Sequence, residues 1–285
     1  VTLYSPGCMM LEFLIPNNVM CHAVEAMLFA SLGCAILSVL ITQMNISSIG
    51  FTMSHAAFAG GSVGAFFGYA VLPSAVLVSI LTAFLMGPLS DRTRMHTDTT
   101  LGVLFGTMMA VAIFFIALMQ GTGKGFDASS LLYGNVISLY REEIYALAVI
   151  TCIILIFLII FYKEITAIVF HKRLAEIAGI QVKPVYYGIL FLISVMVALS
   201  IPIVGGLLLY VWLVTPAAIA YQFCNTMRNM FIMAPVIAVI VSVIGAICGI
   251  LYSLPVGPLT AVIFSGLFVG AVAVSPKRKI VFHNH

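Results

Sequence analysis

Few side chains in this sequence could bind a metal ion or move a proton within an apolar segment, and His55 is the most informative of them. It lies in the run I-G-F-T-M-S-H-A-A-F-A-G-G, directly after a stretch from Gln43 to Gly50 that is polar but uncharged. Ionisable groups in apolar surroundings are costly, and a broken helix there is tolerated where it lines a cavity. We therefore predict that His55 faces a polar pathway through the protein. The alternative is a histidine hydrogen-bonded between helices.

His22 and Glu25 form a second candidate group near the start of the first apolar segment. Residues three apart share one face of a helix, and imidazole and carboxylate groups both bind metal ions. The alternative is that the two side chains pair with each other. Asp98 precedes another apolar run, where capping of a helix N-terminus explains it.

Other patterns indicate structure and not chemistry. Gly60, Gly64 and Gly68 recur every four residues, a spacing that lets two helices approach closely. The run G-T-G-K-G-F from Gly121 lacks the first glycine and the final Ser or Thr of a phosphate-binding loop, so this chain is not expected to bind ATP. The six cysteines are scattered without metal-site spacing, and the tail residues His283 and His285 are expected to be disordered.

Composition explains why so few polar candidates exist. Of the 285 residues, 63% are hydrophobic and 7% are charged, against roughly a quarter charged in soluble domains. Such a chain needs lipid as its solvent, and nothing supports nucleic-acid binding. We predict an all-α polytopic membrane protein with eight or nine spanning helices. The nine candidate spans are 19–42, 53–71, 72–89, 98–120, 142–162, 185–203, 204–221, 229–251 and 257–274.

Positive charge predicts the orientation, because cytoplasmic loops collect Lys and Arg. Ten of the twelve fall on one side if the C-terminus is cytoplasmic, whereas Lys124 and Arg141 fall on the other. The ten are Arg92, Arg94, Lys163, Lys172, Arg173, Lys183, Arg228, Lys277, Arg278 and Lys279. We therefore expect an external segment at 1–18, a transmembrane domain at 19–274 with an inner loop at 163–184, and a cytoplasmic tail at 275–285.

Six short motifs give the chain a resemblance to a known family. They are S-H-A-A-F-A-G from Ser54, D-T-T-L-G from Asp98, L-L-Y-G-N from Leu131, L-A-E-I-A-G-I from Leu174, V-G-G-L-L-L-Y-V-W-L-V-T-P-A-A from Val204 and L-P-V-G-P from Leu254. In this order and spacing, over about residues 17–279, they resemble the permeases of the ABC-3 family of ATP-binding-cassette importers for zinc and manganese.

The resemblance implies a type II importer-like fold in the plasma membrane of a prokaryote. It also implies a homodimer of permeases, two cytoplasmic ATPase subunits that hold ATP and Mg, and an external metal-binding protein. The permease itself then carries no cofactor and no catalytic residue. Leu174, Ala175, Glu176 and Gly179 resemble the coupling helix that docks into the ATPase. The same segment also reads as a short amphipathic helix ended by Gly179.

One departure from the family concerns the substrate. Zinc and manganese permeases usually carry an Asp four residues before the histidine, and here that position is Phe51. Three explanations stay open: Glu25 or His22 supplies the lost ligand; Met53 or Met44 joins His55 to bind a softer ion; or the substrate is a metal chelate or small organic solute. A transition-metal cation is the first interpretation. A polytopic enzyme or an ATP-independent transporter is disfavoured, because no further catalytic or ion-coupling groups accompany these residues.

Overall fold

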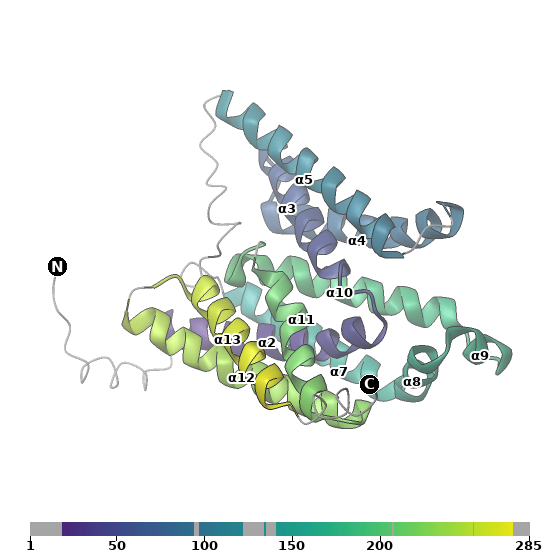
Figure 1. Ribbon diagram of the computed structural model, residues 1–285. Coiled ribbons are helices and arrows are strands. Elements are labelled where there is room, and N and C mark those ends of the chain that lie inside the picture. The colour runs from purple at the N-terminus through teal and green to yellow at the C-terminus, as the bar shows by residue number, and fades with distance from the viewer. Residues whose placement is uncertain are drawn as a thin grey trace.

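The computed structural model describes residues 19–93, 97–121, 134, 141–206, 208–252 and 254–275, and every element in that part of the chain is a helix (Figure 1). In chain order they are α2 (Val19–Gln43), α3 (Ile49–Phe67), α4 (Val71–Thr93), α5 (Thr97–Gly121), α7 (Arg141–Ile160), α8 (Tyr162–Phe170), α9 (Lys172–Ile177), α10 (Val182–Val204), α11 (Leu209–Phe223), α12 (Met227–Leu251) and α13 (Val256–Val274). The predicted all-α fold is confirmed.

The helices form two groups that meet along α10. In the first group α3 packs against α4 and α5, and in the second α2 packs against α7, α11 and α12. Helix α10 contacts α3 and α4 on one side and α7 and α2 on the other. Figure 1 shows this division, with α3, α4 and α5 standing apart from the remaining bundle. Side chains on α10 therefore position both groups.

Seven described helices are long and apolar enough to span a bilayer, fewer than the eight or nine predicted. The two exceptions are α3 and α11, although both occur as helices at predicted positions. Helix α3 is rich in Gly, Ser and Ala, and its residues 52–62 are all buried, so it faces protein and needs little hydrophobicity. Helix α11 has only 15 residues, about 22 Å of helix against a hydrocarbon core of about 30 Å.

Glycine allows the close approach of α3 to α4. A Cβ on Gly60 would lie 2.5 Å from the Ser74 carbonyl oxygen, and a Cβ on Gly64 would clash with the Ser74 side chain. Gly68 was predicted to extend this stripe, but no atom lies within 4 Å of the position of its Cβ. It instead ends α3 in the left-handed conformation, with φ of 79°. Four-residue spacing alone does not distinguish a packing glycine from a capping one.

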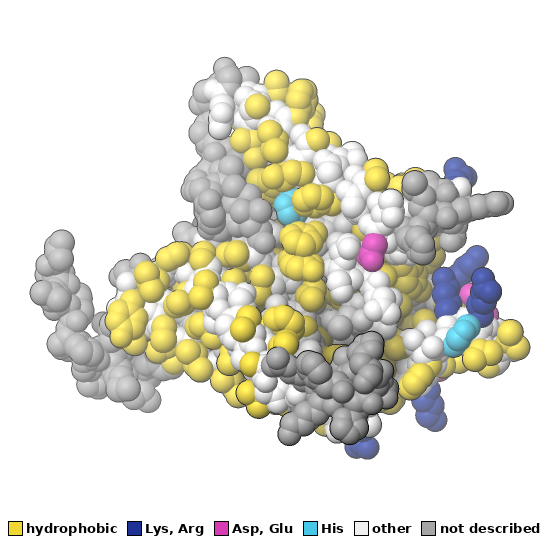
Figure 2. Space-filling view, viewed as in Figure 1, with side chains coloured by type: hydrophobic (Ala, Val, Ile, Leu, Met, Phe, Trp, Pro, Cys, Tyr) yellow, Lys and Arg dark blue, Asp and Glu magenta, His cyan; other side chains and the backbone are white. Residues whose placement is uncertain are grey.

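The C-terminal ends of α2 and α4 and the N-terminal ends of α5 and α10 meet α8 and α9 at one end of the bundle, here called the basic end. Figure 2 shows Lys and Arg side chains gathered there over α8 and α9, while hydrophobic side chains cover much of the rest of this face. This grouping agrees with the charge pattern that predicted a cytoplasmic side.

A cavity of about 560 Å³ opens at the basic end and is called the basic-end hollow. The polar stretch after Gln43 was predicted as a broken helix within the membrane, but residues 44–48 form the connection between α2 and α3, and residues 44–46 line this hollow. Its turn is closed by hydrogen bonds from Met44 N to Leu40 O (2.9 Å) and from Ile46 N to Ile41 O (3.1 Å). The stretch is polar because it lies at an end of the bundle and not within its apolar depth.

Several predicted features lie outside the described residues. They are the segment 1–18, the tail 276–285 with His283 and His285, Lys124, and all of the L-L-Y-G-N motif except Gly134. The Gly134 backbone, with φ of 74°, lies against Ile203 O and Gly205 N at the end of α10, where a Cβ would clash.

Candidate functional site

His55 lies six residues into α3 and is buried, with 5% of its surface exposed. Its Nδ1 is 2.9 Å from the Phe51 carbonyl oxygen, which can only accept a hydrogen bond, so Nδ1 carries the proton. The Ser54 hydroxyl also donates to that carbonyl, at 3.0 Å. The imidazole therefore keeps an unshared electron pair on Nε2. A histidine oriented through Nδ1 in this way is the usual form of a metal ligand.

Three aromatic residues from three helices form a cluster at the imidazole, two of them in contact with it and the third stacked on one of those two. Phe105 of α5 meets it edge-on, with ring centroids 4.7 Å apart, and Phe51 lies at 6.5 Å. Phe51 stacks on Tyr210 of α11 at 3.8 Å with an interplanar angle of 17°. Phe51 is itself 38% exposed and borders a cavity of about 250 Å³. That cavity is lined by Ser48, Phe51, Thr52, Leu101, Gly102 and Phe105.

Two features of α3 hold this cluster in place. Thr52 is buried, and its hydroxyl lies 3.0 Å from the Leu101 carbonyl of α5 and 3.1 Å from its own helix at Ser48. Gly50 is the second feature, because a Cβ there would approach the Tyr210 ring to 3.3 Å. The first turn of α3 is thus hydrogen-bonded to α5 on one side and packs closely against α11 on the other.

The two methionines considered as soft ligands do not share a site with His55. The Met53 sulfur is fully buried and lies 3.9 Å from the Ser79 hydroxyl of α4. Residues two apart lie on nearly opposite faces of a helix, so Met53 points away from the His55 face. Met44 lines the basic-end hollow. The arrangement therefore leaves His55 without a thioether partner from either residue.

His22 and Glu25 lie together, as their spacing predicted, in a hollow of about 160 Å³ with Arg141, Ile144 and Tyr145. This hollow is formed by α2 and α7, and α2 packs chiefly on α12, α11 and α7. Neither residue reaches the aromatic cluster around His55. Among the described residues, no group of three or more His, Cys, Asp or Glu side chains could hold a metal ion. Asp98, predicted as a helix cap, lies in the first turn of α5.

The predicted coupling segment forms a short helix, α9, at the basic end. Its Gly179 has φ of 84°, and hydrogen bonds from Gly179 N to Glu176 O and from Ile180 N to Ala175 O end the helix at that glycine. Ala175 is buried, which anchors the helix, whereas Leu174 is 62% exposed. Glu176 is exposed and borders the basic-end hollow.

Two further residues extend the apolar surface of this segment, and the sequence reasoning missed them. Phe170 is 80% exposed and Ile177 is 82% exposed, on either side of Leu174. Phe170 is the last residue of α8, whereas Leu174 and Ile177 lie three residues apart on α9, so the available signal was large apolar residues within a basic loop. We call Phe170, Leu174 and Ile177 the apolar ridge. Large apolar side chains so exposed at a charged end of a protein indicate a contact surface.

The sequence matches the model of the ABC 3 transport family over residues 16–275. It is 27% identical over 260 residues to the manganese transport system membrane protein MntC of Halalkalibacterium halodurans, covering 91% of this chain and 88% of the relative. It is 26% identical over 251 residues to the chelated iron transport system membrane protein YfeD of Yersinia pestis, covering 88% and 84%.

Two solved structures share the fold. One is PsaBC from Streptococcus pneumoniae in complex with Fab, with a TM-score of 0.84, 20% identity and coverage of 98% of this chain and 99% of that one. The other is an inward-facing conformation of a putative metal-chelate type ABC transporter, with a TM-score of 0.72, 16% identity and coverage of 96% and 92%. At these identities the similarity concerns the fold alone.

Proposed function

The chain belongs to the ABC 3 transport family, and from this membership we propose that it is the membrane-spanning subunit of an ATP-driven importer for a transition-metal cation. The relatives named for manganese and for chelated iron support this substrate class. The chain is a multi-span membrane protein, which suits it to the role of the permease.

The observation that carries the proposal is the His55 imidazole, whose Nδ1 donates to Phe51 O at 2.9 Å and whose Nε2 is left as a ligand. A pore must bind an ion well enough to admit it and weakly enough to release it. One neutral nitrogen without a neighbouring carboxylate meets the second requirement.

The energy for transport comes, in this proposal, from two cytoplasmic ATPase subunits that bind ATP and Mg. The apolar ridge on α8 and α9 supports this part, because its three side chains have a large exposed apolar surface next to basic residues. An external metal-binding protein would deliver the ion to the opposite end, in the plasma membrane of a prokaryote.

The proposed homodimer is supported by an exposed face of α5. Gly102, Gly106 and Ala110 are exposed and recur every four residues, and no atom lies within 4 Å of a Cβ built on either glycine. Small residues at this spacing let two membrane helices approach closely. Gly102 also lines the cavity beside Phe51, so a second copy on this face would close that cavity from the other side.

Reconstitution with the ATPase subunit in liposomes tests the proposal. ATP-driven uptake of labelled Mn(II) or Zn(II) is expected to fall at least about tenfold for His55→Ala, because removing a ligand costs at least as much as removing its supporting hydrogen bond. Ser265→Ala, on α13, is the control and should leave uptake unchanged. Full uptake by His55→Ala, with ATPase activity intact, would show that the imidazole does not contact the ion.

A second candidate is import of a metal chelate, favoured by the aromatic rings of Phe51 and Phe105, which line a cavity of about 250 Å³. Aromatic walls suit an organic ligand better than a bare ion. In that case Phe51→Ala should reduce uptake of the chelate while His55→Ala leaves it unchanged. The opposite pattern supports the bare cation.

A further inference from the structure

The basic-end hollow shares no lining residue with the cavity beside His55. Five segments line it: the connection after α2, the end of α4, the start of α5, the pair α8 and α9, and the first turns of α10. Its volume of about 560 Å³ lies within the usual range for small-molecule sites, roughly 300 to 1,000 Å³. A cavity of this size, open to the side from which charge pattern predicts the cytoplasm, can take a solute or a lipid headgroup.

The lining of the hollow has the chemistry of an anion site. Lys172 and Lys183 oppose a single carboxylate, that of Glu176, so the described lining has one net positive charge. Neither ammonium group forms an ion pair within the described part of the chain. The Thr97 hydroxyl adds a neutral hydrogen-bond donor, whereas the Gln43 amide is directed away from the hollow and donates to the Met230 sulfur at 2.8 Å. Phosphate groups are recognised by ammonium groups together with a hydroxyl donor.

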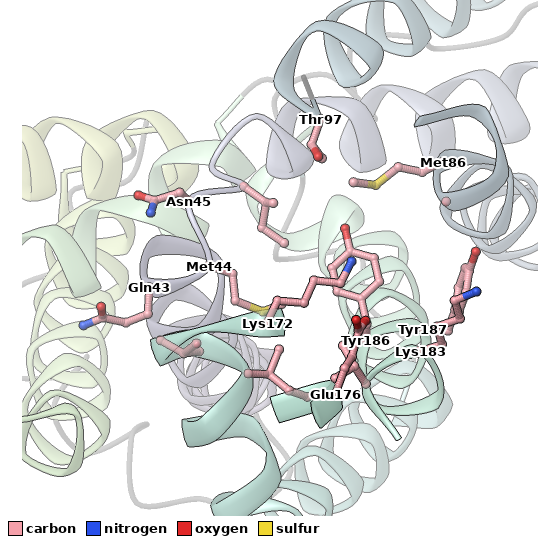
Figure 3. A pocket seen from close by; sticks show the side chains of 15 residues that line it. Gln43, Met44, Asn45, Met86, Thr97, Lys172, Glu176, Lys183, Tyr186 and Tyr187 are labelled. Carbon is pink, nitrogen blue, oxygen red and sulfur yellow. The ribbon is translucent and has the colours of Figure 1, made fainter. Parts of the chain in front are cut away.

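The two lysines are placed by the surrounding helices. Lys172 Nζ lies 5.5 Å from the centre of the Tyr186 ring, and Figure 3 shows the Lys172 side chain directed across the hollow toward that ring. Lys183 and Tyr187 lie together at another side of the hollow in the same view. The Tyr187 side chain packs directly on Gly87 of α4, because any Cβ at Gly87 would clash with the Tyr187 hydroxyl. The lysines therefore border the hollow from α9 and from α10.

We propose that the basic-end hollow binds a phosphate-bearing anion through Lys172 and Lys183. The phosphate belongs either to an anionic lipid of the adjoining leaflet or to a free phosphate ester. Such a ligand bridges α9 and α10, so its binding stabilises the basic end against unfolding. The inference concerns binding alone and does not depend on the transport proposal.

Native mass spectrometry of the purified full chain tests the lipid source, with nanodiscs of phosphatidylcholine and phosphatidylglycerol. Wild type is expected to retain phosphatidylglycerol, and Lys172→Gln/Lys183→Gln should retain about tenfold less, the loss expected for charge-assisted hydrogen bonds. Lys172→Arg/Lys183→Arg should retain it. Lys163→Gln removes an exposed lysine of α8 that does not line the hollow and should behave as wild type.

Thermal unfolding in neutral detergent tests the soluble source, with inorganic phosphate and glycerol 3-phosphate as probes. A rise in Tm for wild type that is lost in Lys172→Gln/Lys183→Gln assigns the site to a free phosphate ester. Lysine-dependent retention of phosphatidylglycerol, with no rise in Tm from either soluble probe, assigns the site to a lipid headgroup. Both lysines are exposed, so the variants are expected to fold. Equal behaviour of wild type and the double glutamine variant in both arms overturns the proposal, whether or not the chain transports a metal.

Discussion

Truncation of Leu174 to alanine should weaken binding of an ATPase subunit without weakening the fold of the permease. Leu174 is 62% exposed on α9, in the middle of the apolar ridge formed with Phe170 and Ile177. Its neighbour Ala175 is buried and anchors the helix to the bundle. The leucine side chain therefore contributes little to the folded chain and has most of its surface available to a partner.

The magnitude follows from the exposed fraction. Complete burial of a leucine side chain is worth about 1.5 to 3 kcal/mol. With 62% of that surface still to be buried on docking, Leu174→Ala should cost about 1 to 2 kcal/mol of binding free energy. That loss corresponds to a Kd raised about 5- to 30-fold.

The assay is titration of the purified ATPase subunit onto the permease in nanodiscs, with thermal unfolding of the permease measured in parallel. Leu254→Ala is the matched control, since Leu254 is a 48% exposed leucine that follows α12, at the end opposite α9. Its Kd should equal that of wild type. An unchanged Kd for Leu174→Ala, or an equal change for Leu254→Ala, would refute the assignment of the apolar ridge as the docking surface.

Three further substitutions test the packing and the site. Gly60→Ala should lower the free energy of unfolding by about 1 to 3 kcal/mol, because its Cβ would meet backbone atoms of α4, whereas Gly266→Ala, with no atom within 4 Å, should be neutral in the same thermal-unfolding assay. Trp212→Phe keeps a buried ring but removes the Nε1 hydrogen bond to Thr260 at 3.3 Å, so a loss of about 1 kcal/mol is expected by denaturant titration. Phe51→Asp places a carboxylate four residues before His55 and should tighten Mn(II) binding, measured by calorimetry; unchanged binding would indicate that the face does not contact the ion.

Sequence patterns were sufficient for features that depend on neighbouring residues. The spans were placed by runs of apolar residues, and α9 and its end by a short amphipathic pattern followed by Gly179. The same reasoning was wrong about Gly68, and it predicted more spans of full length than the described helices provide. A spacing of four residues describes one helix and carries no information about which neighbour that helix contacts.

The surroundings of His55 could not be predicted either, because the sequence does not show which helices pack against α3. Its position in an apolar segment made it a candidate, but Phe105 and Tyr210 reach the site from helices about fifty and more than one hundred and fifty residues away in the chain. Met53 lies against Ser79 and Met44 lines the basic-end hollow, while Glu25 lines a separate hollow between α2 and α7.

By itself, then, the sequence determined an all-helical membrane protein with a basic, predicted cytoplasmic end and a short amphipathic helix in its inner loop, because hydrophobicity, charge and helix ends are local properties. Tertiary structure decided that α3 is interior despite its modest hydrophobicity, that Phe51 stacks on Tyr210, and that the His55 imidazole is buried among aromatic side chains. These features depend on which helices pack together, and that choice is made by side chains far apart in the chain.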